Sequence, residues 1–405
     1  MKCETRKLDE VIEALIDYRG KTPSKTQSGV KLITAKVIKD GFIQDGPHEY
    51  IAQKDYDPWM RRGLPERGDI LLTTEAPLGQ VAQIRDDEKI ALAQRVILLR
   101  AKSSILNQCY FFHLLKSPLI QARLRARSTG TTVLGIKQSE LRQIEIPFPG
   151  LSIQRCVASV LSAYDDLIEN NARRIKMLEE MAKLIYREWF VELKAPGVKL
   201  RKATAEEKKV TGKDVFPEGW EIKTLGDLSS EFRRAVDPAE IDPDTPYIGL
   251  EHMPRQSIAL DSWGVAKEVQ STKLLFSKGE ILFGKIRPYF HKVGIAPTDG
   301  VCSSDIIVIV PKEEDLHALV LACVSSTNFI NHATQTSQGT KMPRANWDVL
   351  LNYSIPTPPE RLLARFSDLI ESKVTLILNL VATNRNLRET RDLLLPKLVS
   401  GEVEV

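Results

Sequence analysis

The sequence predicts an α+β fold in which two similar domains of mixed strand and helix alternate with two long helices. Three observations support this prediction. The 405 residues are enough for two or three cores of ordinary size. Short motifs recur at a nearly constant offset, and each copy ends in a stretch with the periodicity of a long helix. We therefore expect two copies of one unit.

The repeat is defined by two pairs of motifs. Gly130-Thr131 recurs as Gly339-Thr340, and Ile146–Pro149 recurs as Ile355–Pro358, both at an offset of 209 (339 − 130 and 355 − 146). A period this long indicates duplicated domains and not a solenoid.

The order of the segments follows from their composition. Short apolar runs bounded by Gly, Pro and Asp predict strands, and near-helical apolar spacing predicts one helix over Asn107–Arg127 and another over Glu314–Ala333. The stretch Lys194–Glu218 is charged and flanked by prolines, which is typical of a surface linker. We expect a first mixed domain over 1–148, a long helix within 149–193, a linker over 194–216, a second mixed domain over 217–357 and a second long helix within 358–405.

The two long helices are predicted by heptad spacing. Residues 153–190 contain no Pro or Gly, and the second stretch repeats the pattern with interruptions at Lys373 and Arg391. Each could be an ordinary helix packed on its own domain, but their register with the duplication favours pairing with each other. The expected pairing positions are Leu161, Ile168, Asn171, Ile175, Leu178, Ile185, Ile377, Leu380, Asn384, Leu387 and Leu394.

Composition limits the location and the chemistry. The net charge of +4 means that any nucleic-acid surface must be a local patch. The five cysteines are scattered, and no stretch has the length of a signal peptide core or a membrane helix, so we expect a cytoplasmic protein without structural zinc.

Catalytic, cofactor-binding and metal-binding sites are not expected. Gly279–Lys285 fits the first seven positions of a phosphate-binding loop, but Ile286 replaces the Ser or Thr that would coordinate magnesium, and the stretch has the pattern of a strand. The usual motifs of hydrolases, zinc proteases and dinucleotide enzymes are missing.

Basic and aromatic residues are the best candidates for function. Lys285, Arg287, Tyr289 and His291 alternate, so on a strand they would share one face suited to phosphates and base edges. The alternative is a solvated edge strand guarded by charge. The corresponding stretch of the first copy, Thr73–Gly79, lacks these residues, so the copies should not read the same bases. Further candidates, each of which could instead lie in an ordinary turn, are Arg61, Arg62, Thr131, Thr132, Lys137, Arg233, Arg234, Lys292, Lys341 and Arg344.

Over essentially its whole length the sequence resembles the specificity subunits of type I restriction-modification enzymes. The resemblance rests on the duplicated plan, the Gly-Thr loops before Ile-Pro-x-Pro, the segment Gly279–Lys292, the opening Phe216–Trp220 and the ending Leu395–Gly401. The segments Pro149–Gln154 and Pro358–Leu363 depart from the family pattern, and the first copy lacks an opening like Phe216–Trp220, which leaves its start open.

The resemblance implies two target-recognition domains separated by two helices that pair antiparallel, with a pseudo-two-fold relation between the copies and an asymmetric, two-part DNA site. It implies double-stranded DNA, two methylation subunits and restriction subunits as partners. S-adenosylmethionine, ATP and Mg²⁺ would act in those partners. A helix of about 38 residues spans about 57 Å, so the helices would set the spacing of the two half-sites.

Three other classes remain open at this point. An adenine methyltransferase would need an Asn before a Pro-Pro-aromatic motif, which neither Pro147–Pro149 nor Pro356–Pro359 provides. A stand-alone DNA-binding regulator would not co-purify with larger subunits, and a structural scaffold would not bind DNA.

Overall fold

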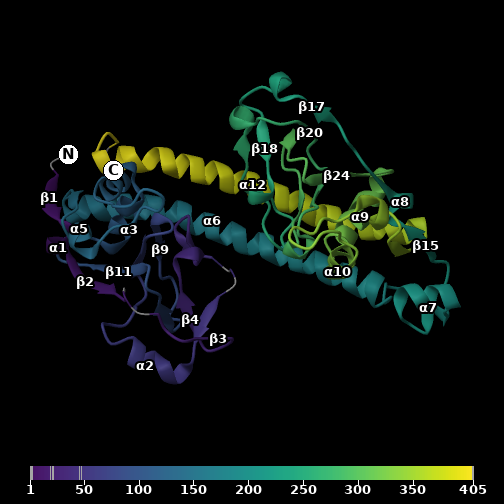
Figure 1. The fold of residues 1–405 in the computed structure, drawn as a ribbon, viewed down its shortest axis with the longest axis horizontal. Coiled ribbons are helices and arrows are strands. Elements are labelled where there is room, and N and C mark those ends of the chain that lie inside the picture. Colours follow the sequence, from purple (N-terminus) through teal and green to yellow (C-terminus); the bar gives the residue numbers. More distant parts are fainter. Residues whose placement is uncertain (1–2, 19, 21, 45, 47, 404–405) are drawn as a thin grey trace. The chain divides into compact units, whose positions relative to one another are not determined.

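The computed structural model describes residues 3–403 except 19, 21, 45 and 47. The chain divides into two compact units, residues 1–166 with 388–405 and residues 167–387. Each unit contains one mixed domain and a part of both long helices (Figure 1).

The first unit is built on an antiparallel sheet with the strand order β2-β11-β8-β9. Its strands are Ile12–Asp17 (β2), Ile70–Thr74 (β8), Leu78–Gln83 (β9) and Val96–Ala101 (β11). Side chains alternate across a strand. Ile97 and Leu99 of β11 therefore pack with the helices on one face, while Val96 and Leu98 pack with the second sheet on the other.

The second sheet of this unit has the order β10-β4-β7-β3. Its strands are Lys25–Thr26 (β3), Val30–Ile33 (β4), Glu49–Ile51 (β7) and Ile90–Leu92 (β10). The smaller strands are Glu4–Lys7 (β1), which pairs with Glu145–Phe148 (β12), and Ile38–Lys39 (β5), which pairs with Phe42–Ile43 (β6). The helices are Leu8–Val11 (α1), Tyr56–Trp59 (α2), Gln108–Lys116 (α3), Pro118–Ala126 (α4) and Gln138–Arg142 (α5), with 3-10 turns at Ala35–Val37 and Gln53–Asp55.

The second unit repeats this plan with the strand order β16-β24-β21-β22, also antiparallel. These strands are Ser229–Glu231 (β16), Ile281–Gly284 (β21), Val293–Ile295 (β22) and Ile306–Pro311 (β24). Ile307 and Ile309 pack on the helical face, and Ile306 and Val308 pack on the other. The alternation of β11 thus recurs in β24 at an offset of 210 (307 − 97).

The remaining elements of the second unit form a second sheet, a short strand pair and further helices. The five-stranded sheet β17-β20-β23-β18-β19 contains Ala235–Val236, Lys273–Phe276, Gly300–Cys302, Pro246–Ile248 and Gly264–Val265. Glu221–Thr224 (β15) pairs with Ser354–Thr357 (β25). The helices are Leu225–Leu228 (α8), His317–Val324 (α9), Thr327–Gln335 (α10) and Trp347–Leu350 (α11), with 3-10 turns at Pro238–Glu240, Leu250–His252, Ala266–Glu268, Pro288–Phe290 and Glu314–Leu316.

The prediction of single helices over 107–127 and 314–333 was wrong. In the first unit α3 ends at Lys116, and the Ser117 side chain caps α4, whose first residue is Pro118. In the second unit α9 ends at Val324, and Ser326 caps α10 by accepting from the Phe329 amide at 3.2 Å. A Ser cap stabilises the start of a new helix. One helix therefore ends and another begins, although the apolar spacing along the sequence continues.

The charged stretch predicted as a linker contains regular structure. Leu200–Lys202 (β13) pairs with Val215–Pro217 (β14), and Ala205–Thr211 (α7) lies between them. Thr204 and Glu207 form a capping box at the start of α7, and Arg201 contacts Glu207 at 2.6 Å. The charged residues of this stretch therefore stabilise a small local fold in addition to being solvated.

The long helices are Leu151–Tyr186 (α6), continued by a π-helical turn at Arg187–Val191, and Glu360–Ser400 (α12). In the second unit Asn171 of α6 donates to Asn384 Oδ1 at 2.9 Å, and the Trp189 ring lies 5.6 Å from the Phe366 ring. Later residues of α6 thus meet earlier residues of α12, so the pair is antiparallel. This confirms the predicted fold class.

The seam is more polar than its spacing predicts. In the first unit Arg391, which seemed to interrupt the heptads, is buried and donates to the buried Asp165 carboxylate at 2.5 Å. In the second unit the buried Lys373 donates to the Leu369 carbonyl at 2.8 Å. Near the end of α12, Leu395, Leu398 and Val399 are buried, whereas the predicted pairing positions Leu387 and Leu394 are half-buried.

Candidate nucleic-acid interface

Each unit presents a short exposed loop, residues 129–135 after α4 in the first unit and residues 338–344 after α10 in the second. Thr129 and Gly135 exchange two backbone hydrogen bonds in the first unit, and Gln338 and Arg344 do the same in the second. Gly130 and Gly339 have φ values of +111° and +97°. A Cβ at Gly130 would lie 2.2 Å from the Val133 carbonyl oxygen, so only glycine fits this turn.

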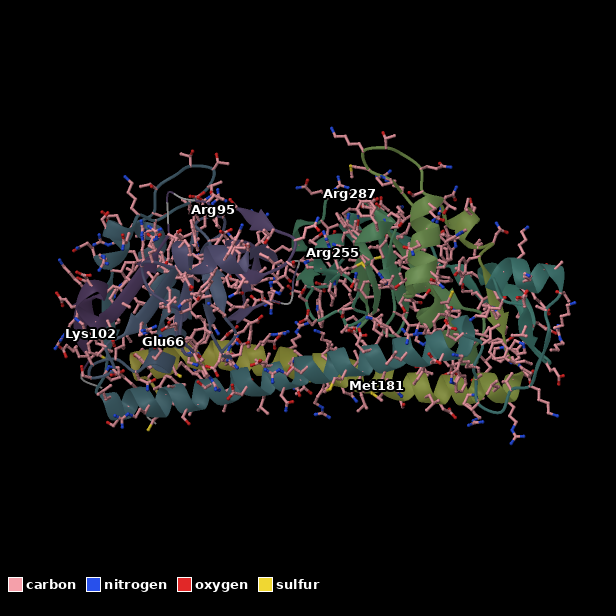
Figure 2. All side chains as sticks on the ribbon, turned by 90° about the horizontal axis from the view of Figure 1, so that it is seen from below. Glu66, Arg95, Lys102, Met181, Arg255 and Arg287 are labelled. Atoms are coloured by element: carbon pink, nitrogen blue, oxygen red, sulfur yellow. The ribbon has the colours of Figure 1, made fainter. Side chains whose placement is uncertain are left out.

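The two loops face solvent on the side of each unit that lies away from the long helices (Figure 2). Thr131, Thr132 and Lys341 are all exposed. Met342 in the second loop is half exposed. The loops therefore offer hydroxyl, ammonium and apolar groups that could contact a duplex.

The prediction that Lys285, Arg287, Tyr289 and His291 share one strand face was wrong. Strand β21 ends at Gly284, and Pro288–Phe290 forms a 3-10 turn. Arg287 and His291 have φ values of +50° and +52°. The left-handed backbone at Arg287 and His291 turns the chain away from the direction of the strand. Pro288 cannot donate a backbone hydrogen bond to a neighbouring strand, so the strand does not continue through it.

The side chains of this turn point in different directions. Tyr289 is half exposed, and Arg287 lies near the Lys341 carbonyl and over the Phe290 ring. By contrast, His291 contacts the Ser325 carbonyl at 2.8 Å, and Lys292 donates to the Leu250 carbonyl. Burial lowers the pKa of both His291 and Lys292. These two are therefore poorer candidates for DNA contact than Arg287 and Tyr289.

Three of the predicted residues come together in one cavity of about 670 Å³ in the second unit. Arg233, Lys285 and Arg344 line it, although they come from distant parts of the sequence. Arg234 turns away from it and pairs with Glu280 at 2.5 Å.

The candidates of the first unit do not form such a cluster. Arg62 makes structural contacts: its backbone amide donates to the Tyr18 hydroxyl at 3.0 Å, and its guanidinium donates to the Asp17 carbonyl. Arg61 is exposed beside it. Lys137 is exposed at the start of α5, directly after the loop.

The backbone around the loops is the same in both units, but the side chains differ. In the first unit the Thr74 amide donates to the Arg95 carbonyl, and the Thr74 carbonyl accepts from the Ile136 amide. In the second unit the Lys285 amide donates to the Asp305 carbonyl, and the Lys285 carbonyl accepts from the Ala345 amide. The equivalent pairs are therefore Thr74 and Lys285, Arg95 and Asp305, and Gly135 and Arg344. At equivalent places the two units thus carry different side chains.

Sequence reasoning missed several exposed or unpaired groups near these loops. Arg95 pairs with Glu75 at 3.2 Å, and the Arg255 guanidinium carbon lies 4.0 Å from the centre of the Phe290 ring. Trp347 lines the cavity of the second unit. The offset of about 210 could have identified Arg95 as the counterpart of Asp305, but no local motif marks the others.

No group of three or more His, Cys, Asp or Glu side chains in the described part of the chain could hold a metal ion. No described helix is both long and apolar enough to span a bilayer.

Comparison with known proteins decides the family. Residues 2–180 and 217–362, more than half of the chain, match the family described as the type I restriction modification DNA specificity domain. The chain belongs to this family. The two matched ranges correspond to the two copies of the repeat.

Individual members of the specificity family are distant in sequence. The chain is 27% identical to the MjaIX specificity subunit of Methanocaldococcus jannaschii over 84% of this chain and 78% of that protein. It is 24% identical to the EcoDI specificity subunit of Escherichia coli over 92% and 86% of the two chains. The crystal structure of a type I S subunit from M. genitalium has a TM-score of 0.56 at 16% identity, covers 98% and 96% of the two chains, and shares the fold.

Proposed function

We propose that this chain reads an asymmetric, two-part sequence in double-stranded DNA and directs the adenine methylation and restriction carried out by partner subunits. One observation carries the proposal. The two units share the same backbone hydrogen bonds around their exposed loops, but the first loop exposes Thr132 and Val133 where the second exposes Lys341 and Met342. Two equivalent readers with unlike side chains recognise unlike half-sites.

The paired helices suit a spacing role in this proposal. Helix α6 has 36 residues and α12 has 41, and each contributes to both units. At 1.5 Å per residue, α6 is about 54 Å long. We propose that this length, and not any base contact, fixes the unread spacer between the half-sites.

The helices also offer a surface for the proposed methylation subunits. Within the second unit, α6 exposes Met177, Met181 and Leu184, which recur at helical spacing, and α12 exposes Leu369 and Leu376 seven residues apart. Figure 2 shows Met181 on the helical side of the unit, away from the loops. Exposed apolar side chains that repeat at helical spacing suit a protein interface. S-adenosylmethionine, ATP and Mg²⁺ would then bind the partners, and this chain would contribute no catalytic group.

Sequencing genomic DNA for methylated adenines tests the proposal. Cells that express the methylation subunits with this chain should contain methylated adenines in one interrupted, asymmetric sequence, and cells that lack this chain should not. Methylation by the purified chain alone would favour an enzyme. Specific DNA binding without co-purifying subunits would favour a stand-alone regulator, and absence of DNA binding would favour a scaffold.

A further inference from the structure

A short segment of the second unit, residues 256–259, lies between helix α6 and the sheet that contains β22. Gln256 at its start has left-handed backbone with a φ of +60°. The Ile258 carbonyl accepts from the Ile295 amide of β22 at 3.0 Å. Arg255, directly before the segment, lies between α6 and the exposed 338–344 loop in Figure 2. The segment therefore lies on the way from the helix to the loop.

Glu179 of α6 holds this segment. Its side chain is 5% exposed. Its Oε1 atom accepts from the Ser257 hydroxyl at 2.7 Å, from the Ile258 amide at 2.8 Å and from the Ala259 amide at 3.1 Å. Hydrogen bonds to a charged acceptor are stronger than those between neutral groups. One buried oxygen thus fixes both the position and the direction of three consecutive residues.

Hydrogen bonds continue from the segment to the 338–344 loop. The Gln256 carbonyl accepts from Lys183 of α6 at 2.9 Å, and the Gln256 amide donates to the His291 carbonyl at 2.9 Å. His291 ends the 3-10 turn that Arg287 begins. The Arg287 amide in turn donates to the Pro343 carbonyl of the loop at 2.7 Å. A continuous series of contacts within the second unit therefore joins α6 to the loop.

Building on the proposed function, we propose that Glu179 is a positioning residue for sequence reading by the second unit: it holds segment 256–259 against α6, and the segment sets the position of the turn and of the 338–344 loop. Glu179 is buried and touches no DNA. Its effect is on the fraction of molecules whose loop is placed to read bases, and affinity for the specific sequence scales with that fraction. Contacts to the phosphates alone need no such placement of the loop.

Replacement of Glu179 separates this role from folding. Glu179→Met leaves the Ile258 amide without its acceptor, whereas the Ala259 amide keeps the Ser257 hydroxyl oxygen at 3.3 Å. Ile258 and Ala259 remain packed in the apolar core, so the unit should fold with a displaced segment. Glu179→Gln keeps an acceptor oxygen for the same three donors.

The test measures the affinity of the complex with the methylation subunits for four duplexes. One carries the methylated sequence, two have one half-sequence scrambled, and one has both scrambled. The half-sequence read by the second unit is the one that changes when residues 217–357 are exchanged. The control Asp368→Ala removes an exposed carboxylate from α12 in the same unit.

Glu179→Met should weaken binding to the methylated sequence by about tenfold, because a buried donor is left unpaired and the reading position of the loop is less populated. The preference for the half-sequence read by the second unit should fall by the same factor. The preference for the other half-sequence and the affinity for the fully scrambled duplex should not change. Glu179→Gln and Asp368→Ala should bind like the parent.

Hydrogen exchange follows the series of contacts directly. In Glu179→Met the amides of Gln256 and Arg287 should exchange faster than in the parent, although neither residue contacts Glu179. Thermal melting checks that all variants are folded.

Four outcomes would overturn the positioning role. They are an unchanged preference in Glu179→Met, equal weakening on all four duplexes, faster exchange that stops at the segment without reaching Arg287, and a Glu179→Gln variant as poor as Glu179→Met. If the parent itself binds all four duplexes equally, the proposed function has failed instead, because no sequence is read.

Discussion

The amide pair of Asn171 and Asn384 should fix the register of the helices at a measurable energetic cost. Asn171 donates to Asn384 Oδ1 at 2.9 Å, and Asn384 donates in turn to the Ile168 carbonyl at 3.2 Å. Both asparagines are buried. The perturbation is a double-mutant cycle of Asn171→Leu, Asn384→Leu and the variant with both changes.

The magnitudes follow from what each change leaves unpaired. Asn171→Leu leaves Asn384 its bond to Ile168 and should lower the free energy of local opening by about 1 kcal/mol. Asn384→Leu removes both bonds and leaves a buried amide without a partner, which should cost about 2 kcal/mol. The double variant has two apolar groups in contact and should be nearly neutral, so the coupling free energy is about 3 kcal/mol.

Hydrogen exchange of the α6 and α12 amides measures these opening free energies. We expect Asn384→Leu to speed exchange more than Asn171→Leu and the double variant to restore protection. Single effects that add to within about 0.5 kcal/mol would refute this account, because independent sites do not couple. The double variant should also show weaker register, detectable as alternative disulfides between cysteines introduced along the two helices.

Three further predictions concern charge, pH and length. Arg391→Met removes the guanidinium that donates to the buried Asp165 carboxylate and leaves Lys116, 3.5 Å away, as a weaker partner, so it should lower the unfolding free energy of the first unit by about 3 kcal/mol in urea denaturation. Adding Asp165→Leu should recover only part of this loss, because Lys116 then has no carboxylate partner. Burial lowers the pKa of His113 to about 3, so between pH 6.5 and about 3 the unfolded chain binds a proton that the folded chain does not. Stability should fall by about 1.4 kcal/mol per pH unit across this window, and thermal melts of His113→Gln should lack that contribution. Adding seven residues to both α6 and α12 preserves the heptads and lengthens each helix by about 10 Å. Methylome sequencing should then find the same half-sequences with a spacer that is longer by one to about three base pairs. A change in the half-sequences themselves would contradict the spacing role of the helices.

The parts of the fold that sequence predicted best depend on long-range regularity. The duplication and the helix pair follow from a constant offset and a heptad pattern, which many residues support together. The helix ends at Ser117 and Ser326 were missed because a capping serine separates two helices without changing the spacing of the apolar residues.

The candidate interface was predicted less completely. Alternation suggested a strand over 285–291, but left-handed backbone at Arg287 and His291 places these side chains in different directions. Arg233 and Arg344 are more than a hundred positions apart in the sequence, so only the tertiary fold brings them into one cavity. Local pattern therefore identified basic residues but not which of them act together.

The most direct test of the account exchanges residues 217–357 for the corresponding domain of another family member and sequences the methylated genomic DNA. If the domains read bases and the helices set the spacing, one half-sequence should change to that of the donor protein, while the other half-sequence and the spacer stay the same. A swap that altered the spacer alone, or both half-sequences together, would contradict the division of roles between domains and helices.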